Sequence, residues 1–307
     1  MVATALSVLI CTYNRPALLA QALDALIHRT AEKPDEVVIV NGGDERADGV
    51  VRGFQGLPGV VVKLLKTVNV NLAASRNVGL PHCTGDIVAM TDDDAEVFPD
   101  WVARLKRAHA GHPEAGGVGG AVIGANSAES LLSRLADVVT FSSPPKPCYV
   151  RTLPGVNVSY KREVIARLGP QDETLFRGED VDFNWRIKRL GYEIYYDHEI
   201  KVLHHHRPAL LSFLSQHYMY GRAYYLVRRK WPEMYCVYPH GIRRLRDLLK
   251  LGYFFVAAVY EPLCVAWRLV GWPDRLLAMP ILIANHVVWK WGMVRQKWLT
   301  HAHAEHR

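Results

Sequence analysis

Apolar residues follow two different patterns along the first part of the chain. Short continuous runs such as Leu6–Cys11 are typical of strands buried on both faces of a sheet. Between these runs, apolar residues recur at helical spacing, first after Pro16, a residue that suits the first turn of a helix. Strands that alternate with helices predict a parallel sheet with helices on both faces. The predicted strands are 6–11, 37–40, 60–65 and 86–90, and the predicted helices begin after Pro16, after Asn71 and near Asp180.

The pattern is less regular in the middle of the chain, from Gly116 to Leu203. This segment contains the glycine-rich run Gly116–Gly120 and a stretch rich in serine and proline at residues 142–145. We therefore expect mixed strands and mobile loops here.

Two apolar stretches dominate the last third of the chain. Residues 251–266 are interrupted by Glu261-Pro262, and residues 276–293 by Pro280 and Lys290. Neither stretch supplies the roughly 20 apolar residues that a membrane-spanning helix needs. Five of the eight tryptophans lie after residue 266, and tryptophan favours the membrane interface. We expect interfacial or re-entrant helices, or a hairpin, with a helical lid or a dimer contact as the alternative.

The net charge of +7 is concentrated in the same third. Residues 221–300 contain 13 Lys and Arg against 4 Asp and Glu. Such a surplus can attract nucleic acid. Here it is interleaved with long uncharged stretches, which favours an anionic membrane surface as partner and no nucleic acid. The residues expected to face that surface include Arg243, Arg244, Arg246 and Lys250.

The cysteines and the N-terminus indicate a cytosolic setting. The five cysteines are scattered without any C-x-x-C spacing, which argues against a disulfide framework and a zinc site and favours a reducing compartment. The start, Met1–Ala5, has no basic region of the kind that opens a secretory signal. We expect the N-terminal part of the chain to stay in the cytosol.

Three adjacent carboxylates, Asp92, Asp93 and Asp94, follow the strand predicted over 86–90. They repel one another unless a cation joins them, and hard cations such as Mg²⁺ and Mn²⁺ take oxygen ligands and often bind substrate phosphates as well. Ligands of open α/β sheets bind beyond the carboxyl ends of the strands. The triplet therefore predicts a site for a metal and a diphosphate. The alternative is an acidic turn that caps the next helix.

A second carboxylate pair, Glu179-Asp180, follows Gly178 and precedes a segment with helical spacing. A carboxylate at a helix N-terminus is stabilised as the anion, so this pair can also be ordinary capping. Its presence in one chain with the acidic triplet and the later histidines His204–His206 favours a catalytic role.

Five short motifs together resemble the inverting family 2 glycosyltransferases of the GT-A fold, in particular the bacterial membrane-associated type. The resemblance covers about residues 5–225, and the motifs occur in the family's order. They are Cys11–Pro16, Ala74–Gly79, Gly155–Asn157, Gly178–Asp180 and Val202–His204.

The resemblance implies transfer of a sugar from a nucleoside diphosphate donor, with Mg²⁺ or Mn²⁺ on the diphosphate. It implies Asp92, Asp94 and His204 as metal ligands. Asp180 is the implied base that takes a proton from an acceptor hydroxyl, and Glu179 orients the acceptor or shares that role.

Further residues are assigned to the donor and the acceptor by the same resemblance. The nucleotide-sugar residues are Thr12, Asn14, Asn41, Arg76, Asp92 and Asp93, and the acceptor residues are Gly155, Asn157, Gly178 and Trp185. Asn41 stands where relatives commonly carry an aspartate, so the base is open. Trp185 can equally be a core residue at helical spacing.

We therefore predict a GT-A α/β domain over residues 1–230, with the nucleotide-sugar half at about 1–115 and the acceptor half at about 116–230. A membrane-associated helical segment over 231–300 and a disordered tail over 301–307 follow. The predicted enzyme adds one sugar to a lipid-linked or cell-surface glycan at the cytoplasmic face of the cell membrane, and a homodimer is left open. The alternatives are a sugar nucleotidyltransferase and a non-catalytic membrane scaffold that retains a nucleotide-sugar domain.

Overall fold

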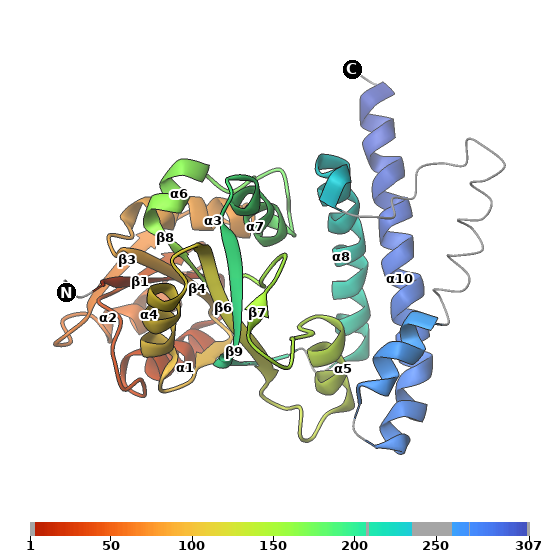
Figure 1. Ribbon diagram of the computed structural model, residues 1–307, viewed down its shortest axis with the longest axis horizontal. Coiled ribbons are helices and arrows are strands. Elements are labelled where there is room, and N and C mark those ends of the chain that lie inside the picture. Colours follow the sequence, from red (N-terminus) through yellow and green to blue (C-terminus); the bar gives the residue numbers. More distant parts are fainter. Residues whose placement is uncertain (1–3, 207–208, 235–259, 270, 306–307) are drawn as a thin grey trace. The chain divides into compact units, whose positions relative to one another are not determined.

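A computed structural model describes residues 4–206, 209–234, 260–269 and 271–305 (Figure 1). The chain divides into two compact units. One is formed by the residues up to Ala125 together with Ser143–His205, and the other by Asn126–Ser142 together with the residues from His206 onward. The second unit thus takes in residues 206–230, which the sequence pattern assigns to the catalytic domain.

The first unit is built on a nine-stranded mixed sheet in the order β3-β2-β1-β4-β8-β6-β9-β5, with β7 paired to β9. The neighbours β3, β2, β1 and β4 are parallel, as the alternation of strands and helices predicts. The second half is mixed, because β8 runs antiparallel to both β4 and β6. The strands are β1 (Leu6–Thr12), β2 (Glu36–Asn41), β3 (Val61–Lys66), β4 (Ile87–Asp92), β5 (Ala95–Val97), β6 (Ala115–Gly124), β7 (Cys148–Tyr149), β8 (Val158–Lys161) and β9 (Glu193–His204).

Helices cover both faces of this sheet, as Figure 1 shows for α3, α6 and α7 on one face and α1, α2 and α4 on the other. Strand and helix side chains meet in a core that includes Leu9, Met90, Phe183 and Ile187. The helices are α1 (Pro16–Ile27), α2 (Glu45–Arg52), α3 (Leu72–Gly79), the short 3₁₀ helix η1 (Leu80–His82), α4 (Trp101–Gly111), α6 (Arg162–Leu168) and α7 (Glu179–Arg189).

The glycine-rich run at residues 116–120 lies inside β6, where it allows close packing. A Cβ on Gly120 would collide with the carbonyl oxygen of Ile200, and the pairing of β6 with β9 shifts register between Gly120 and Ala121. Glycine is needed here because the backbones approach too closely for any side chain.

The second unit is helical. It contains α5 (Leu131–Val139), α8 (Leu210–Lys230), the 3₁₀ helix η2 (Pro232–Met234), a helical stretch at 260–267 and α10 (Trp272–Glu305). Helices α8 and α10 run side by side (Figure 1), and a Cβ on Gly221 or Gly292 would collide with backbone of the facing helix. The apolar core of the unit is formed by Leu135, Ala136, Phe213, Ala266, Leu269, Ala278 and Leu282.

Helix α10 extends well beyond the last apolar stretch of the sequence. Pro280 and Lys290, which interrupt that stretch, both lie within the continuous helix. The helix also extends to Glu305, so residues 301–305 are helical where the sequence pattern predicts a disordered tail. Pro280 removes one backbone hydrogen bond from α10. Close packing of α10 on α8 stabilises the helix in spite of this loss, and such packing is not visible in the local sequence. The basic residues at 243–250 and most of the stretch 251–266 lie outside the described residues.

Candidate active site

The acidic triplet lies where β4 ends and β5 begins. Asp92 is the last residue of β4, Asp93 and Asp94 form the turn, and Ala95 opens β5. Because a strand follows at once, the triplet does not cap a helix, and this alternative is excluded. Ala95 pairs with His204 in the antiparallel ladder between β5 and β9, and the His205 amide donates to the Asp94 carbonyl at 2.9 Å. This pairing brings a residue more than 100 positions away beside the triplet.

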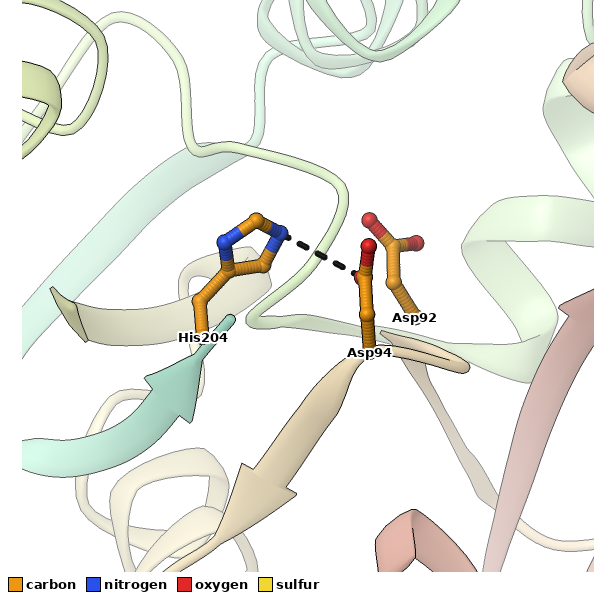
Figure 2. Close-up of side chains that lie close together, drawn as sticks. All are labelled: Asp92, Asp94 and His204. Atoms are coloured by element: carbon orange, nitrogen blue, oxygen red, sulfur yellow. Dashed lines mark ion pairs between the residues drawn. The ribbon is translucent and has the colours of Figure 1, made fainter. Parts of the chain in front are cut away.

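Asp92, Asp94 and His204 point toward one another (Figure 2). Each offers one ligand atom, and these atoms all lie within 4.8 Å of one another. His204 Nε2 lies 3.3 Å from Asp94 Oδ1. Two carboxylates and an imidazole, all partly buried, are a donor set that suits Mn²⁺ and tolerates Mg²⁺. The residues present therefore fit a divalent cation.

The charges of this group are strongly interdependent. Burial raises the pKa of Asp92, although the nearby Arg76 guanidinium opposes the shift. Burial also acts to raise the pKa of Asp94, but the hydrogen bond and charge of His204 outweigh it, and the pKa of Asp94 falls below its ordinary value. Burial would lower the pKa of His204, yet the bond to Asp94 raises it. Negative charge is concentrated here, which is the condition under which a cation binds.

Only one of the three consecutive histidines faces this group. His205 follows the last residue of β9, and its Nε2 is 2.8 Å from Glu96 Oε1. His206 belongs to the second unit, with its Nε2 2.8 Å from Asp137 Oδ1. His204 is the last residue of β9, so the two histidines that follow it lie beyond the strand.

Asp93 is not one of the three residues whose ligand atoms converge, and it is held by Thr12 and Arg15 instead. The Thr12 hydroxyl donates to its Oδ2 at 2.7 Å, and Arg15 Nη1 donates to its Oδ1 at 3.1 Å. Burial raises the pKa of Asp93 to about 6. The same Arg15 nitrogen donates to Asp94 Oδ2 at 2.7 Å. Arg15 was missed as a site residue by the sequence analysis, although it stands inside the quoted motif Cys11–Pro16.

Arg76 connects the triplet to the second carboxylate pair. Its side chain is 3% exposed, with Nη2 3.5 Å from Asp92 Oδ1 and Nη1 3.0 Å from Glu179 Oε1. A third contact is a hydrogen bond to the Gly155 carbonyl, and a Cβ on Gly155 would lie 2.6 Å from Arg76 Nη2. Gly155 therefore makes room for the guanidinium. The predicted contact of Arg76 with a nucleotide stays a prediction; in the structure its guanidinium contacts Asp92, Glu179 and Gly155.

Glu179 and Asp180 open α7 after Gly178, whose φ of 80° is a conformation that favours glycine. Glu179 is buried, and burial raises its pKa to about 7. Asp180 is only half-buried: its Oδ2 accepts from the Gly155 amide at 3.0 Å and its Oδ1 from the Val181 amide at 2.8 Å. The two neighbouring carboxylates thus have different environments, and Asp180 is the more accessible one.

Two asparagines predicted to contact ligands are instead used within the fold. Asn41 is fully buried; its Oδ1 accepts from the Gly43 amide at 2.7 Å and its Nδ2 donates to Asp48 at 2.6 Å. Asn157 is also fully buried, and it accepts from Trp101 Nε1 at 2.9 Å. Direct contact of these amides with the base or the acceptor stays a prediction; in the structure both side chains satisfy their hydrogen bonds within the protein, as buried amides do.

The remaining predicted residues lie around the same edge. Thr12 is buried against Asp93, whereas Asn14 is exposed, at a φ of 54°, and accepts from the Asp44 amide at 3.0 Å. Trp185 is half-buried on α7, and its Nε1 has no hydrogen-bond partner among the described residues. The structure therefore leaves Asn14 and Trp185 as candidate ligand contacts.

The mixed sheet, with a pair of carboxylates after β4 and a histidine at the end of β9, defines a fold of the GT-A type. The family model for glycosyl transferase family 2 matches residues 7–164, about half of the chain. The chain belongs to this family.

Curated relatives share part of the chain. A glucosyl-dolichyl phosphate glucuronosyltransferase from Haloferax volcanii is 31% identical over 184 residues, which is 57% of this chain and 58% of that protein. A pre-mycofactocin glycosyltransferase from Mycobacterium tuberculosis is 30% identical over 156 residues, which is 48% of this chain and 33% of that protein. This chain thus spans between one third and three fifths of the length of these relatives.

A solved structure shares the fold. The mannosyltransferase PcManGT from Pyrobaculum calidifontis, in complex with GDP-Man and Mn²⁺, superposes with a TM-score of 0.67 at 18% identity. The match covers 96% of this chain and 87% of that one. The predicted GT-A fold is confirmed by this likeness.

Proposed function

We propose that this chain is a metal-dependent, inverting glycosyltransferase. It moves one sugar from a nucleoside diphosphate sugar to a hydroxyl of a lipid-linked or cell-surface glycan. The observation that carries the proposal is the convergence of Asp92, Asp94 and His204 ligand atoms within 4.8 Å at the end of β4 and β9.

These three residues would hold Mg²⁺ or Mn²⁺ on the donor's diphosphate. When bound, the metal supplies Lewis-acid stabilisation of the negative charge that builds on the departing diphosphate. The solved mannosyltransferase with GDP-Man and Mn²⁺ supports a donor of this chemistry. Since a nucleoside diphosphate is a good leaving group when neutralised in this way, the chain needs to provide one base and no general acid.

Asp180 is the proposed base. In an inverting displacement the acceptor oxygen forms a bond to the anomeric carbon while the bond to the diphosphate breaks, and the acceptor's proton goes to a carboxylate oxygen. Asp180 is half-buried and fixed by two backbone amides, whereas Glu179 is buried against Arg76. Glu179 is therefore proposed to orient Asp180 and the acceptor side through Arg76 and Gly155.

The lipid acceptor and the location at the cytoplasmic face of the cell membrane rest on two observations. One relative's name includes a dolichyl phosphate-linked sugar. In the described part of the chain, residues 272–300 of α10 are long and apolar enough to cross a membrane, by length and composition only. An anionic membrane surface is accordingly proposed as a partner, through the second unit.

A donor panel tests the proposal. Full-length protein is incubated with Mn²⁺, individual nucleoside diphosphate sugars and a lipid extract, and release of nucleoside diphosphate is measured. We expect Asp94→Asn to abolish release and weaken Mn²⁺ binding, and Asp180→Asn to abolish transfer with donor affinity nearly unchanged. Asp24→Asn, an exposed carboxylate on α1 paired with Arg29, is the matched control and should behave as wild type. Normal turnover by Asp180→Asn would remove that residue from the mechanism.

A further inference from the structure

The β1–α1 loop and the acidic triplet are joined through one guanidinium. Arg15 Nη1 bridges Asp93 Oδ1 at 3.1 Å and Asp94 Oδ2 at 2.7 Å. From the other side the Thr12 hydroxyl donates to Asp93 Oδ2 at 2.7 Å. Asp93 is thus held at both oxygens, and it fixes the position of the arginine.

This arrangement leaves the two oxygens of Asp94 with different tasks. Oδ2 accepts from Arg15, and Oδ1 is directed at His204 Nε2, 3.3 Å away. Oδ1 is therefore the oxygen on the side of the group that fits a metal. A carboxylate can rotate about its χ2 torsion, and a hydrogen bond to one oxygen is what fixes the other in a ligand direction.

We propose that Arg15 is a positioning residue for the metal site: it orients the Asp94 carboxylate, and the pair Thr12–Asp93 holds Arg15 in place. This inference rests on the proposed metal-dependent function. It assigns Asp93 to the support of the site, as neither a metal ligand nor a nucleotide contact. Arg15 also belongs to the loop that carries Asn14, so the metal side and the nucleotide side of the site share one short segment.

The positive charge of Arg15 affects Mn²⁺ binding in the opposite direction to its role in orienting Asp94, so the experiment must separate the two effects. A single substitution of Arg15 removes a positive charge near the metal, which by itself would tighten cation binding. The double variant Arg15→Gln with Asp93→Asn removes the ion pair as a whole and leaves the local net charge unchanged. Any loss of Mn²⁺ affinity in this double variant is therefore due to the lost orientation of the Asp94 carboxylate.

The test is Mn²⁺ binding to the full chain without donor, followed by the electron paramagnetic resonance of free Mn²⁺. We expect the double variant to bind Mn²⁺ about 10–100-fold more weakly than wild type, the range typical of a lost outer-shell partner. Thr12→Val should change affinity in the same direction by a smaller factor. Arg29→Gln is the matched control, because Arg29 pairs with Glu96 two residues beyond Asp94 and should leave Mn²⁺ affinity unchanged.

The outcomes separate this inference from the function on which it rests. If Asp94→Asn loses Mn²⁺ while the double variant binds as tightly as wild type, the role of Arg15 is refuted and the metal site stands. If wild type and Asp94→Asn bind Mn²⁺ equally, the metal site and the role of Arg15 fall together. Melting temperatures in EDTA show that each variant is folded; if the double variant is not, Thr12→Val decides the question.

Discussion

Replacing Asn157 with leucine is expected to destabilise the first unit severely without directly changing acceptor recognition. Asn157 is fully buried, and its side chain satisfies three partners. Its Oδ1 accepts from Trp101 Nε1 at 2.9 Å, and its Nδ2 donates to the carbonyls of Ala121 at 2.8 Å and Ile200 at 2.9 Å. The amide thereby joins β6, β9 and α4 at a single point.

The magnitude follows from the groups left behind. Leucine has nearly the same size but no polar atoms, so one N–H and two carbonyls lose their partner in the core. Each buried unsatisfied group costs about 1–3 kcal/mol. Burial of the apolar side chain offsets roughly 1–2 kcal/mol. A net loss of about 1–8 kcal/mol follows, which for a unit of this size lowers Tm by roughly 2–30 °C at about 2–4 °C per kcal/mol.

The assay is thermal unfolding followed by tryptophan fluorescence, with donor and acceptor KM measured well below the melting transition. Asn184→Leu is not a suitable control, because Asn184 also bonds backbone inside the core. Asn126→Leu makes the same change of side chain outside the sheet and serves as the control. A melting temperature within 2 °C of wild type together with a raised acceptor KM would refute the reasoning and return Asn157 to the acceptor site.

Two further predictions concern histidines. His204→Ala should weaken Mn²⁺ binding by at least about tenfold, since a direct ligand matters more than an outer-shell partner; His205→Ala, whose ring contacts Glu96, should not, and equal losses would contradict the assignment. Burial and the charge of Lys161 lower the pKa of His109 to about 3, so the unfolded chain binds a proton below pH 6.5 that the folded chain does not. Stability should therefore fall with pH from about 6.5 toward 3, by about 2 kcal/mol at pH 5. In thermal unfolding at pH 7 and pH 5, His109→Gln should lose less stability than wild type, and an identical loss would contradict this account.

Local patterns in the sequence were enough to predict most of the first unit. The four parallel strands and α1 follow from apolar runs and helical spacing, and α3 begins after Asn71, whose side chain accepts from the Ala74 amide at 2.9 Å. Capping and periodicity are decided within a few residues, so a single sequence reports them. The order of the five motifs also indicated the family that the comparison with known proteins confirmed.

The roles of individual polar side chains could not be predicted in the same way. Arg76, Asn41 and Asn157 stand at positions that the family resemblance associates with ligands, and the structure buries all three among protein partners. Arg15 shows the reverse case, a motif residue whose bridge between Asp93 and Asp94 becomes visible only when the loop folds over the triplet. The burial of a side chain depends on how elements distant in sequence pack together. The spacing of motif residues in the sequence does not predict it.

The sequence by itself determined the alternation of strands and helices, the placement of carboxylates at strand and helix ends, and the class of chemistry that these carboxylates favour. The tertiary structure alone decided that His204 lies beside Asp94, because the antiparallel pairing of β5 with β9 joins residues more than 100 positions apart. It also decided that α10 continues through Pro280, because packing on α8 stabilises the helix beyond its local propensity. Local interactions fix which elements form, and only long-range packing fixes which side chains meet.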